Sequence, residues 1–192
     1  MLKGFILSLG LIAGLSAQAN TEKSVFENVL AKEQVAIMAQ AETMGLNWKV
    51  GDTCNYNMNM GFINGTMIMS VREISAEGIW IDQKADLGFL GKQDMSALID
   101  PNTGAIKKII VNGKEQAPPE SDVELIDTAE DHITVPAGSF DVIHFRIKDK
   151  KENKEINQWV NPKLIPLSGM VKSQSPAQFG DVVLELTSFR KN

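Results

Sequence analysis

Side chains that could bind an apolar molecule recur at every second position between residues 54 and 62. The run Cys-Tyr-Met-Met-Phe alternates there with three asparagines and one glycine. Because successive side chains of a strand point to opposite faces, these five side chains share one face. Methionine is flexible and polarisable, so such a face suits ligands of varied apolar shape. The residues predicted to bind an apolar small molecule or lipid, such as an acyl chain, are Tyr56, Met58, Met60, Phe62, Met67 and Met69.

Cysteine and methionine are also soft metal ligands, and Cu(I) favours thiolate and thioether donors. Copper sites usually add histidine, and neither His132 nor His144 is near this segment in the sequence. We therefore predict no metal and no cofactor. Cys54 is the single cysteine, which excludes an intramolecular disulfide. On an apolar face, burial raises the pKa of a thiol and makes it unreactive.

Ser139, Asp141 and His144 carry the side chains of a hydrolase triad within six residues. However, Ser139 follows a Pro-Ala-Gly turn and lacks the glycine-flanked elbow that exposes a nucleophilic serine. Asp141 and His144 fall on opposite faces of the predicted strand. The sequence has no glycine-rich phosphate loop and no His-Glu-x-x-His motif. We predict that the protein is not an enzyme and has no catalytic residues.

The elements that position the apolar face are strands. Asn64-Gly65 is a strong hairpin signal, because both residues tolerate a positive φ. A two-residue turn at this position would pair Phe62 with Met67, Met60 with Met69, and Met58 with Val71. Asn112-Gly113 is a second hairpin signal, and turns are also predicted at residues 100–104 and 136–139. The other predicted strands are 78–81, 95–99, 106–111, 133–135, 140–147, 156–160, 169–172 and 182–189.

Residues 21–44 form the exception, because their apolar side chains recur every three or four positions. This spacing predicts an amphipathic helix that Thr21 caps and that ends at Gly45. One helix followed by nine or ten short antiparallel strands predicts a mainly β (α+β) fold. In it, the N-terminal helix packs on a large curved antiparallel sheet, in a half-barrel.

The first nineteen residues predict export. Lys3 precedes an apolar run from Phe5 to Leu15, and the run is followed by Ser-Ala-Gln-Ala. This is the pattern of a signal peptide cleaved after Ala19, which leaves residues 20–192 as a single periplasmic domain. Removing Lys3 leaves 18 basic against 24 acidic residues, a balance that argues against nucleic acid as a partner. No later segment is apolar enough to predict a transmembrane span.

Two groups of residues carry a resemblance to a known family. One is Trp48-Lys49-Val50-Gly51-Asp52, and the other is residues 135–141 followed by 159–162 and 169–172. In these motifs the chain resembles periplasmic proteins of domain-of-unknown-function families, which are similar to the LolA/LolB-type lipoprotein carriers. The resemblance implies a half-barrel with an apolar cavity. Carriers of that type hold an arginine in the cavity, whereas Arg72 and Arg146 are predicted on the opposite face of their strands.

The function predicted from these observations is that of a periplasmic, non-enzymatic binding protein. It would hold an acyl chain or another apolar ligand in the half-barrel cavity. The alternative is an envelope structural or assembly protein whose core is filled and which acts by contact with an envelope protein partner. The sequence leaves this choice open, because a methionine-rich face serves equally well as a packed core.

Overall fold

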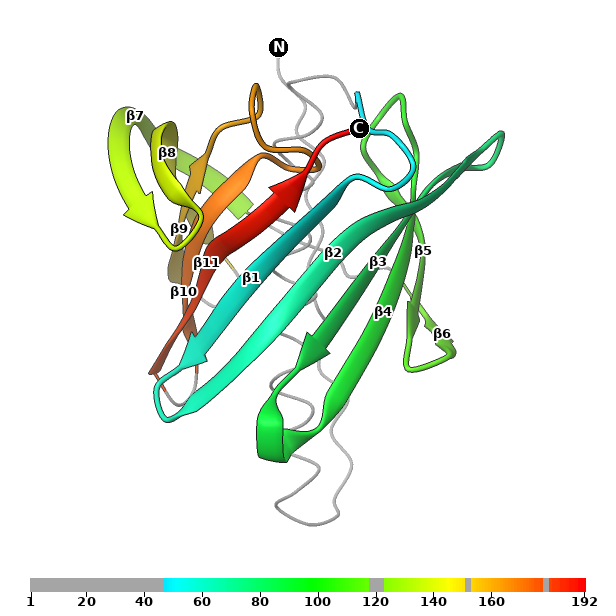
Figure 1. The fold of residues 1–192 in the computed structure, drawn as a ribbon, viewed down its shortest axis with the longest axis horizontal. Helices are drawn as coiled ribbons and strands as arrows, with labels where there is room; N and C mark the ends of the chain where they lie inside the picture. Colours follow the sequence, from blue (N-terminus) through cyan, green and yellow to red (C-terminus); the bar gives the residue numbers. More distant parts are fainter. Residues whose placement is uncertain (1–46, 118–122, 151–152, 178–179) are drawn as a thin grey trace.

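The computed structural model describes residues 47–117, 123–150, 153–177 and 180–192. These residues form a single antiparallel sheet of eleven strands that is curled and open (Figure 1). The elements are β1 (Thr53–Met60), β2 (Ile63–Ser75), β3 (Gly78–Asp86), η1 (Gly88–Leu90), β4 (Lys92–Ile99), β5 (Ile106–Val111), β6 (Lys114–Gln116), β7 (Val123–Val135), β8 (Gly138–Asp149), β9 (Lys154–Val160), β10 (Met170–Ala177) and β11 (Gly180–Arg190).

The chain enters the sheet in its middle. From β1 it meanders to one edge at β6, crosses to the opposite edge at β7, and meanders back until β11 pairs with β1. Strands that are neighbours in the sheet are therefore consecutive in the chain, except the pair of β1 and β11. This topology confirms the predicted large curved antiparallel sheet. The predicted helix over residues 21–44 and the signal peptide lie outside the described residues.

One face of the sheet is buried along most of its width. Along most of β1, β3, β9 and β11, every second residue is buried and the residues between are half-buried or exposed, as the period of a strand requires. Their buried side chains join a continuous apolar cluster that reaches from Val111 on β5 to Met170 on β10. Ile81, Leu184 and Leu186 are each at most 1 % exposed. The described residues include no helix that is long and apolar enough to cross a membrane.

The first hairpin differs from the predicted one. Its turn is Gly61-Phe62, and Asn64-Gly65 lies inside β2. Gly61 has a φ of +67°, so a glycine occupies the first corner, as a type II′ turn requires. Gly65 serves another purpose, because a Cβ atom on it would lie 2.5 Å from the carbonyl oxygen of Asp86. The glycine of the Asn-Gly pair therefore permits a close approach of β3 and does not form the turn.

The other predicted turns are confirmed. Asn112 and Gly113 both have positive φ values, +49° and +77°, and they join β5 to β6. Residues 100–104 form the loop between β4 and β5, which the amide of Gly104 closes with a 2.8 Å hydrogen bond to the Asp100 carbonyl. Residues 136–137 join β7 to β8.

The β7–β8 hairpin bends over the outer face of the sheet at its turn, as the left side of Figure 1 shows. The amide of Ala137 donates a 3.0 Å hydrogen bond to the carbonyl of Leu186 on β11. Phe140 meets Phe189 edge to face, with ring centroids 6.5 Å apart. The bend therefore brings apolar side chains of the hairpin, among them Val135, Phe140 and Val142, into the main apolar cluster.

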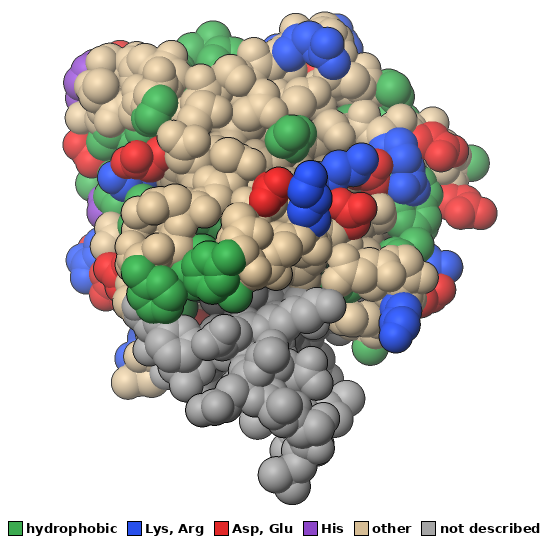
Figure 2. All heavy atoms as spheres, turned by 60° about the horizontal axis from the view of Figure 1, so that its bottom comes forward, with side chains coloured by type: hydrophobic (Ala, Val, Ile, Leu, Met, Phe, Trp, Pro, Cys, Tyr) green, Lys and Arg blue, Asp and Glu red, His purple; other side chains and the backbone are tan. Residues whose placement is uncertain are grey.

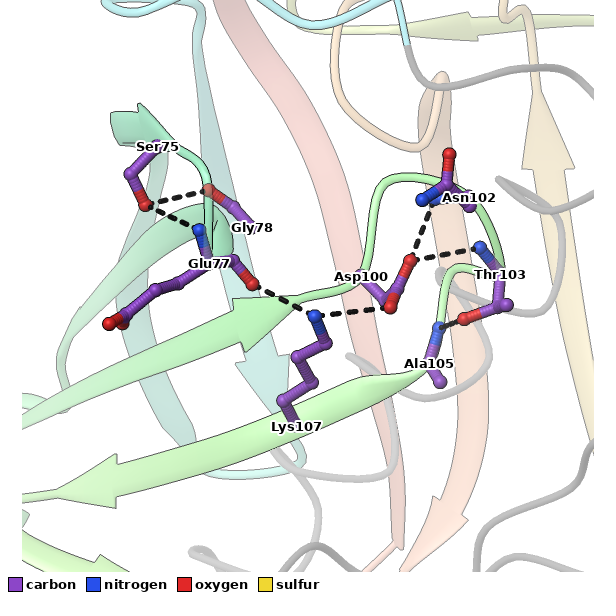
Figure 3. A network of polar contacts seen from close by, with 8 residues as sticks. All are labelled: Ser75, Glu77, Gly78, Asp100, Asn102, Thr103, Ala105 and Lys107. Atoms are coloured by element: carbon purple, nitrogen blue, oxygen red, sulfur yellow. Dashed lines mark hydrogen bonds and ion pairs between the residues drawn. The ribbon is translucent and has the colours of Figure 1, made fainter.

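A polar network ties two turns together at the top of the sheet (Figure 3). The ammonium group of Lys107 donates to the carbonyl of Glu77, at 2.9 Å, and lies 3.1 Å from Asp100 Oδ2. The backbone amide of Asn102 and the Lys107 ammonium hold the pKa of Asp100 below its ordinary value. The network fixes the β2–β3 turn against the β4–β5 loop, at one corner of the curled sheet.

Candidate functional site

Five of the six predicted ligand-binding residues lie together on the buried face. Tyr56 pairs with Met67 across β1 and β2, and Met58 and Met60 follow on β1. Met69 pairs with Cys54, two residues further along the same two strands. All five side chains are 1–5 % exposed. We name the five residues Tyr56, Met58, Met60, Met67 and Met69 the methionine face.

Phe62 is separate from the methionine face. It occupies the β1–β2 turn and is 72 % exposed. The predicted pairing of Phe62 with Met67 is therefore wrong. A type II′ turn takes the residue after its glycine out of the ladder, and the side chain therefore leaves the buried side. Phe89, on η1 in the β3–β4 connection, is also exposed, at 75 %. Figure 2 shows hydrophobic side chains gathered at this end of the molecule.

Most buried polar side chains around the methionine face are amides and hydroxyls, among them Gln83, Gln158, Ser173 and Ser175. One carboxylate, that of Asp52, is also buried beside Cys54, where it accepts hydrogen bonds from the backbone amides of Lys49 and Asn192. Arg72 lies on the outer face, where it pairs with Asp82 at 2.9 Å and stacks on Trp80. Arg146 also lies outside and forms ion pairs with Asp127 and Glu155. This confirms the predicted orientation of both arginines.

Cys54 lies at one end of the methionine face and is fully buried. Its thiol donates a 3.6 Å hydrogen bond to the carbonyl of Pro166. Burial raises the pKa of this thiol to about 12. The described residues contain no group of three or more histidine, cysteine or acidic side chains that could hold a metal ion. The position of Cys54 therefore fits an unreactive core thiol, as its sequence pattern predicts.

The loop between β9 and β10 covers this end of the methionine face. Ile165 and Leu167 in the loop are buried, and the indole of Trp48 donates a 2.7 Å hydrogen bond to the Leu167 carbonyl. The phenol of Tyr56 donates a 3.1 Å hydrogen bond to the Met170 carbonyl, where the loop enters β10. Burial raises the pKa of Tyr56, so the phenol stays a donor. Both bonds satisfy carbonyl groups that are shielded from water.

Replacing Tyr56 by phenylalanine is expected to lower the free energy of unfolding by about 1–2 kcal/mol. The variant keeps the ring but leaves the buried Met170 carbonyl without its donor. Urea unfolding followed by tryptophan fluorescence measures the change, and the slope of the transition should stay constant. An unchanged midpoint would contradict a structural role for this hydrogen bond.

A second, polar group of residues lies at the bent β7–β8 hairpin. His132 Nδ1 is 2.7 Å from Asp141 Oδ1, across the two strands. A groove of about 800 Å³ lies beside this pair, lined by Glu130, Asp131, His132, Asp141, Val142, Ile143, Val160, Asn161, Pro162 and Lys163. We name it the β7–β8 groove. Sequence reasoning did not identify it, although the register of a two-residue turn at 136–137 places His132 opposite Asp141.

The suspected triad residues do not converge. Ser139 Oγ lies 2.8 Å from Thr134 Oγ1. His144 stacks on Trp159, with ring centroids 4.4 Å apart, and its Nε2 is 2.9 Å from Asn157 Oδ1. Asp141 pairs with the other histidine, His132. The three residues thus have separate partners on the hairpin.

Comparison with known proteins adds evidence on the fold. The chain matches no protein-family profile, and no curated protein matches it significantly. Among solved structures it is similar to a hypothetical protein of Chlamydia trachomatis, with a TM-score of 0.52 and 12 % identity over 81 % of this chain and 92 % of that one. At this identity the likeness indicates a shared fold.

Two weaker likenesses accompany it. MucB in the MucA/MucB complex of Pseudomonas aeruginosa has a TM-score of 0.45 and 9 % identity, over 83 % of this chain but 56 % of that one. A Bacteroides fragilis protein described as exported, with a YmcC-like fold, has a TM-score of 0.38 and 12 % identity, over 75 % of this chain and 97 % of that one. Neither likeness is close enough to bear on function.

Proposed function

We propose that this protein is an exported, non-enzymatic binding protein of the bacterial envelope that holds an acyl chain or another apolar group against the methionine face. The observation that carries the proposal is a methionine-rich surface, flanked mainly by amide and hydroxyl groups, on the buried side of a curled, open sheet. It agrees with the sequence resemblance to LolA/LolB-type carriers. Phe62, exposed at the end of the hairpin, is not part of the proposed lining.

The driving force is the removal of apolar surface from water, worth roughly 25 cal/mol for each Å² before ordering costs. The four methionines adapt to the ligand at small cost, because each side chain has several accessible rotamers. The neighbouring amide and hydroxyl groups of Gln83 and Ser173 are neutral. A ligand with a charged group would therefore keep that group outside the lining, where water solvates it.

The methionine face is buried in the structure, so a ligand has to displace whatever covers it. The sequence offers residues 21–44 as the candidate cover, because their amphipathic pattern gives a helix one apolar side. Gated access of this kind predicts that binding is slower than diffusion, since opening precedes contact with the ligand. Stopped-flow mixing with a fluorescent fatty acid would measure that rate.

The proposal is tested on protein purified from the envelope of its host. Native mass spectrometry is expected to show a bound apolar molecule, and extraction with organic solvent should identify it. Titration of the delipidated protein with a fluorescent fatty acid should then give saturable binding. The absence of both a co-purified molecule and fatty-acid binding would exclude the carrier function.

Replacing Met58 by glutamine is expected to weaken binding of the fluorescent fatty acid about tenfold or more. Glutamine has nearly the volume of methionine, but its amide loses hydrogen bonds to water when an acyl chain covers it. The matched control is Asn57→Gln, which places the same side chain one residue earlier on the exposed face. Equal affinities for the two variants would place the ligand elsewhere.

The second candidate function is that of an envelope structural or assembly protein. The observation that favours it is the low exposure of the methionine face, at most 5 %, which is what a filled core gives. Such a protein would act through its outer surface or a sheet edge, by contact with an envelope protein. Fatty-acid binding separates the two functions, because a filled core leaves no room for the chain.

A further inference from the structure

The two edges of the sheet are unequal. β6 forms one edge with three residues, whereas β7 forms the other with thirteen, from Val123 to Val135. Within the described part of the chain, β7 forms strand pairs with β8 alone. The outward side of an edge strand presents backbone N–H and C=O groups that a further strand can pair with. β7 therefore offers a long backbone surface for strand addition.

The side chains of β7 give this edge a negative charge. The strand carries the carboxylates of Glu124, Asp127, Glu130 and Asp131, and no lysine or arginine. Arg146 and Lys150 of the β8 side pair with Asp127 and Glu124, at 2.8 and 3.3 Å. Glu130 has no ion-pair partner among the described residues. Two copies of this edge would repel each other, because both strands carry four carboxylates and no lysine or arginine.

The β7–β8 groove lies beside the second half of this edge. Its carboxylates are those of Glu130, Asp131 and Asp141, and Lys163 is the one lysine or arginine among the described residues that line it. Ile143, Val160 and Pro162 add apolar surface. A lysine or arginine side chain fits this combination, because its aliphatic stem packs on apolar groups while its charged head reaches a carboxylate.

Apolar side chains are also exposed on the first half of the same strand. Leu125 is 55 % and Ile126 is 43 % exposed, next to the bulge that shifts the register with β8. Phe145, on the neighbouring strand, is partly buried against a small cluster of Ile147 and Ile156. An added strand with apolar side chains at this end would cover exposed surface here.

We propose that the β7 edge binds an extended segment of a partner protein by strand addition, and that the segment carries lysine or arginine side chains, one of which enters the β7–β8 groove. Free backbone groups provide the affinity, and the carboxylates select for a basic sequence. The inference specifies the partner class of the second candidate function. It does not depend on an apolar ligand, so the fatty-acid assay and the peptide assay below fail independently.

The test uses the full mature protein and a fluorescent synthetic peptide that alternates lysine with valine. Fluorescence anisotropy is expected to show saturable binding that weakens as salt is added, because the charges are screened. Two further peptides act as controls. Glutamate in place of lysine should abolish binding, and N-methylation of the backbone should do the same because it removes the donors of the added strand.

In the protein, the substitution Glu130→Lys is expected to weaken peptide binding about tenfold, because the attraction between Glu130 and a peptide lysine becomes a repulsion between two lysines. The matched control is Glu73→Lys, an exposed residue of β2 outside the groove, which should leave the affinity unchanged. Equal binding of the N-methylated peptide would overturn the proposal, because charge alone would then explain the affinity. No binding would also overturn it, as would a dimer in sedimentation velocity that the peptide does not displace.

Discussion

Replacing Gly169 by alanine is expected to destabilise the protein by about 3–5 kcal/mol. Gly169 has a φ of +74°, a conformation that side-chain-bearing residues rarely adopt. A Cβ atom at this position would also lie 2.6 Å from Cα and 2.7 Å from the nitrogen of Pro162. These are backbone atoms, so the contact is relieved only if the loop between β9 and β10 moves.

The movement would reach the methionine face. The same loop carries Pro166 and Leu167, which accept hydrogen bonds from Cys54 and Trp48. The amide of Asn161 donates to the Gly169 carbonyl at 2.7 Å and closes the loop. A displaced loop would therefore weaken several buried contacts together, and this supports the upper part of the expected range.

Urea or thermal unfolding measures the effect, with Gly113→Ala as the matched control. Gly113 has a nearly equal φ of +77°, but a Cβ atom there would meet nothing within 4 Å. This variant should cost about 1 kcal/mol, the price of the backbone conformation alone. The difference between the two variants isolates the steric contact with Pro162. Similar losses for both would show that the loop adapts freely.

The sequence predicts the buried face well because the period of a strand is local. The hairpin turn lies at Gly61-Phe62 and not at Asn64-Gly65, so Met58 pairs with Gly65 instead of Val71. The partner moves by six residues, an even number, and an even shift leaves every side chain on its original face. Five of the six residues therefore stay together, and only the residue inside the new turn, Phe62, is lost from the group.

Features that depend on contacts between residues far apart in the sequence cannot be predicted from a local pattern. The role of Gly65 is set by the carbonyl of Asp86, on a different strand. The bend of the β7–β8 hairpin depends on the bond from Ala137 to Leu186, whose residues are far apart in the sequence. The β7–β8 groove follows from that part of the fold, and its acidic residues look in the sequence like ordinary surface charges.

Cys54 is expected to react with Ellman's reagent about a thousandfold more slowly, or slower still, in the native protein than in the urea-unfolded chain. The thiolate is the reactive species, and its pKa is about 12 in the folded state against an ordinary value of 9.0. That difference alone lowers the thiolate fraction near neutral pH by about a thousandfold. Full burial of the side chain adds a steric barrier.

The measurement is simple, because the chain has one cysteine and the unfolded control must therefore release one equivalent of the reagent's thiolate product for each chain. In the unfolded chain the rate should rise with pH and level off above about 9, as the thiol ionises. As long as the native protein stays equally stable over the pH range, the rate of its direct reaction with the reagent would continue to rise toward pH 12. A levelling near 9 in the native protein would instead show that the reagent reacts through transiently opened molecules.

The same reaction distinguishes the two candidate functions. When labelling proceeds through molecules whose sheet has opened, a ligand that binds only the intact sheet slows it by the factor 1 + [L]/Kd. A fatty acid held against the methionine face should therefore protect Cys54, which lies at one end of that face beside Met69. With a filled core, labelling should be slow and indifferent to fatty acid, and the outer surface with its β7 edge becomes the place where the protein acts.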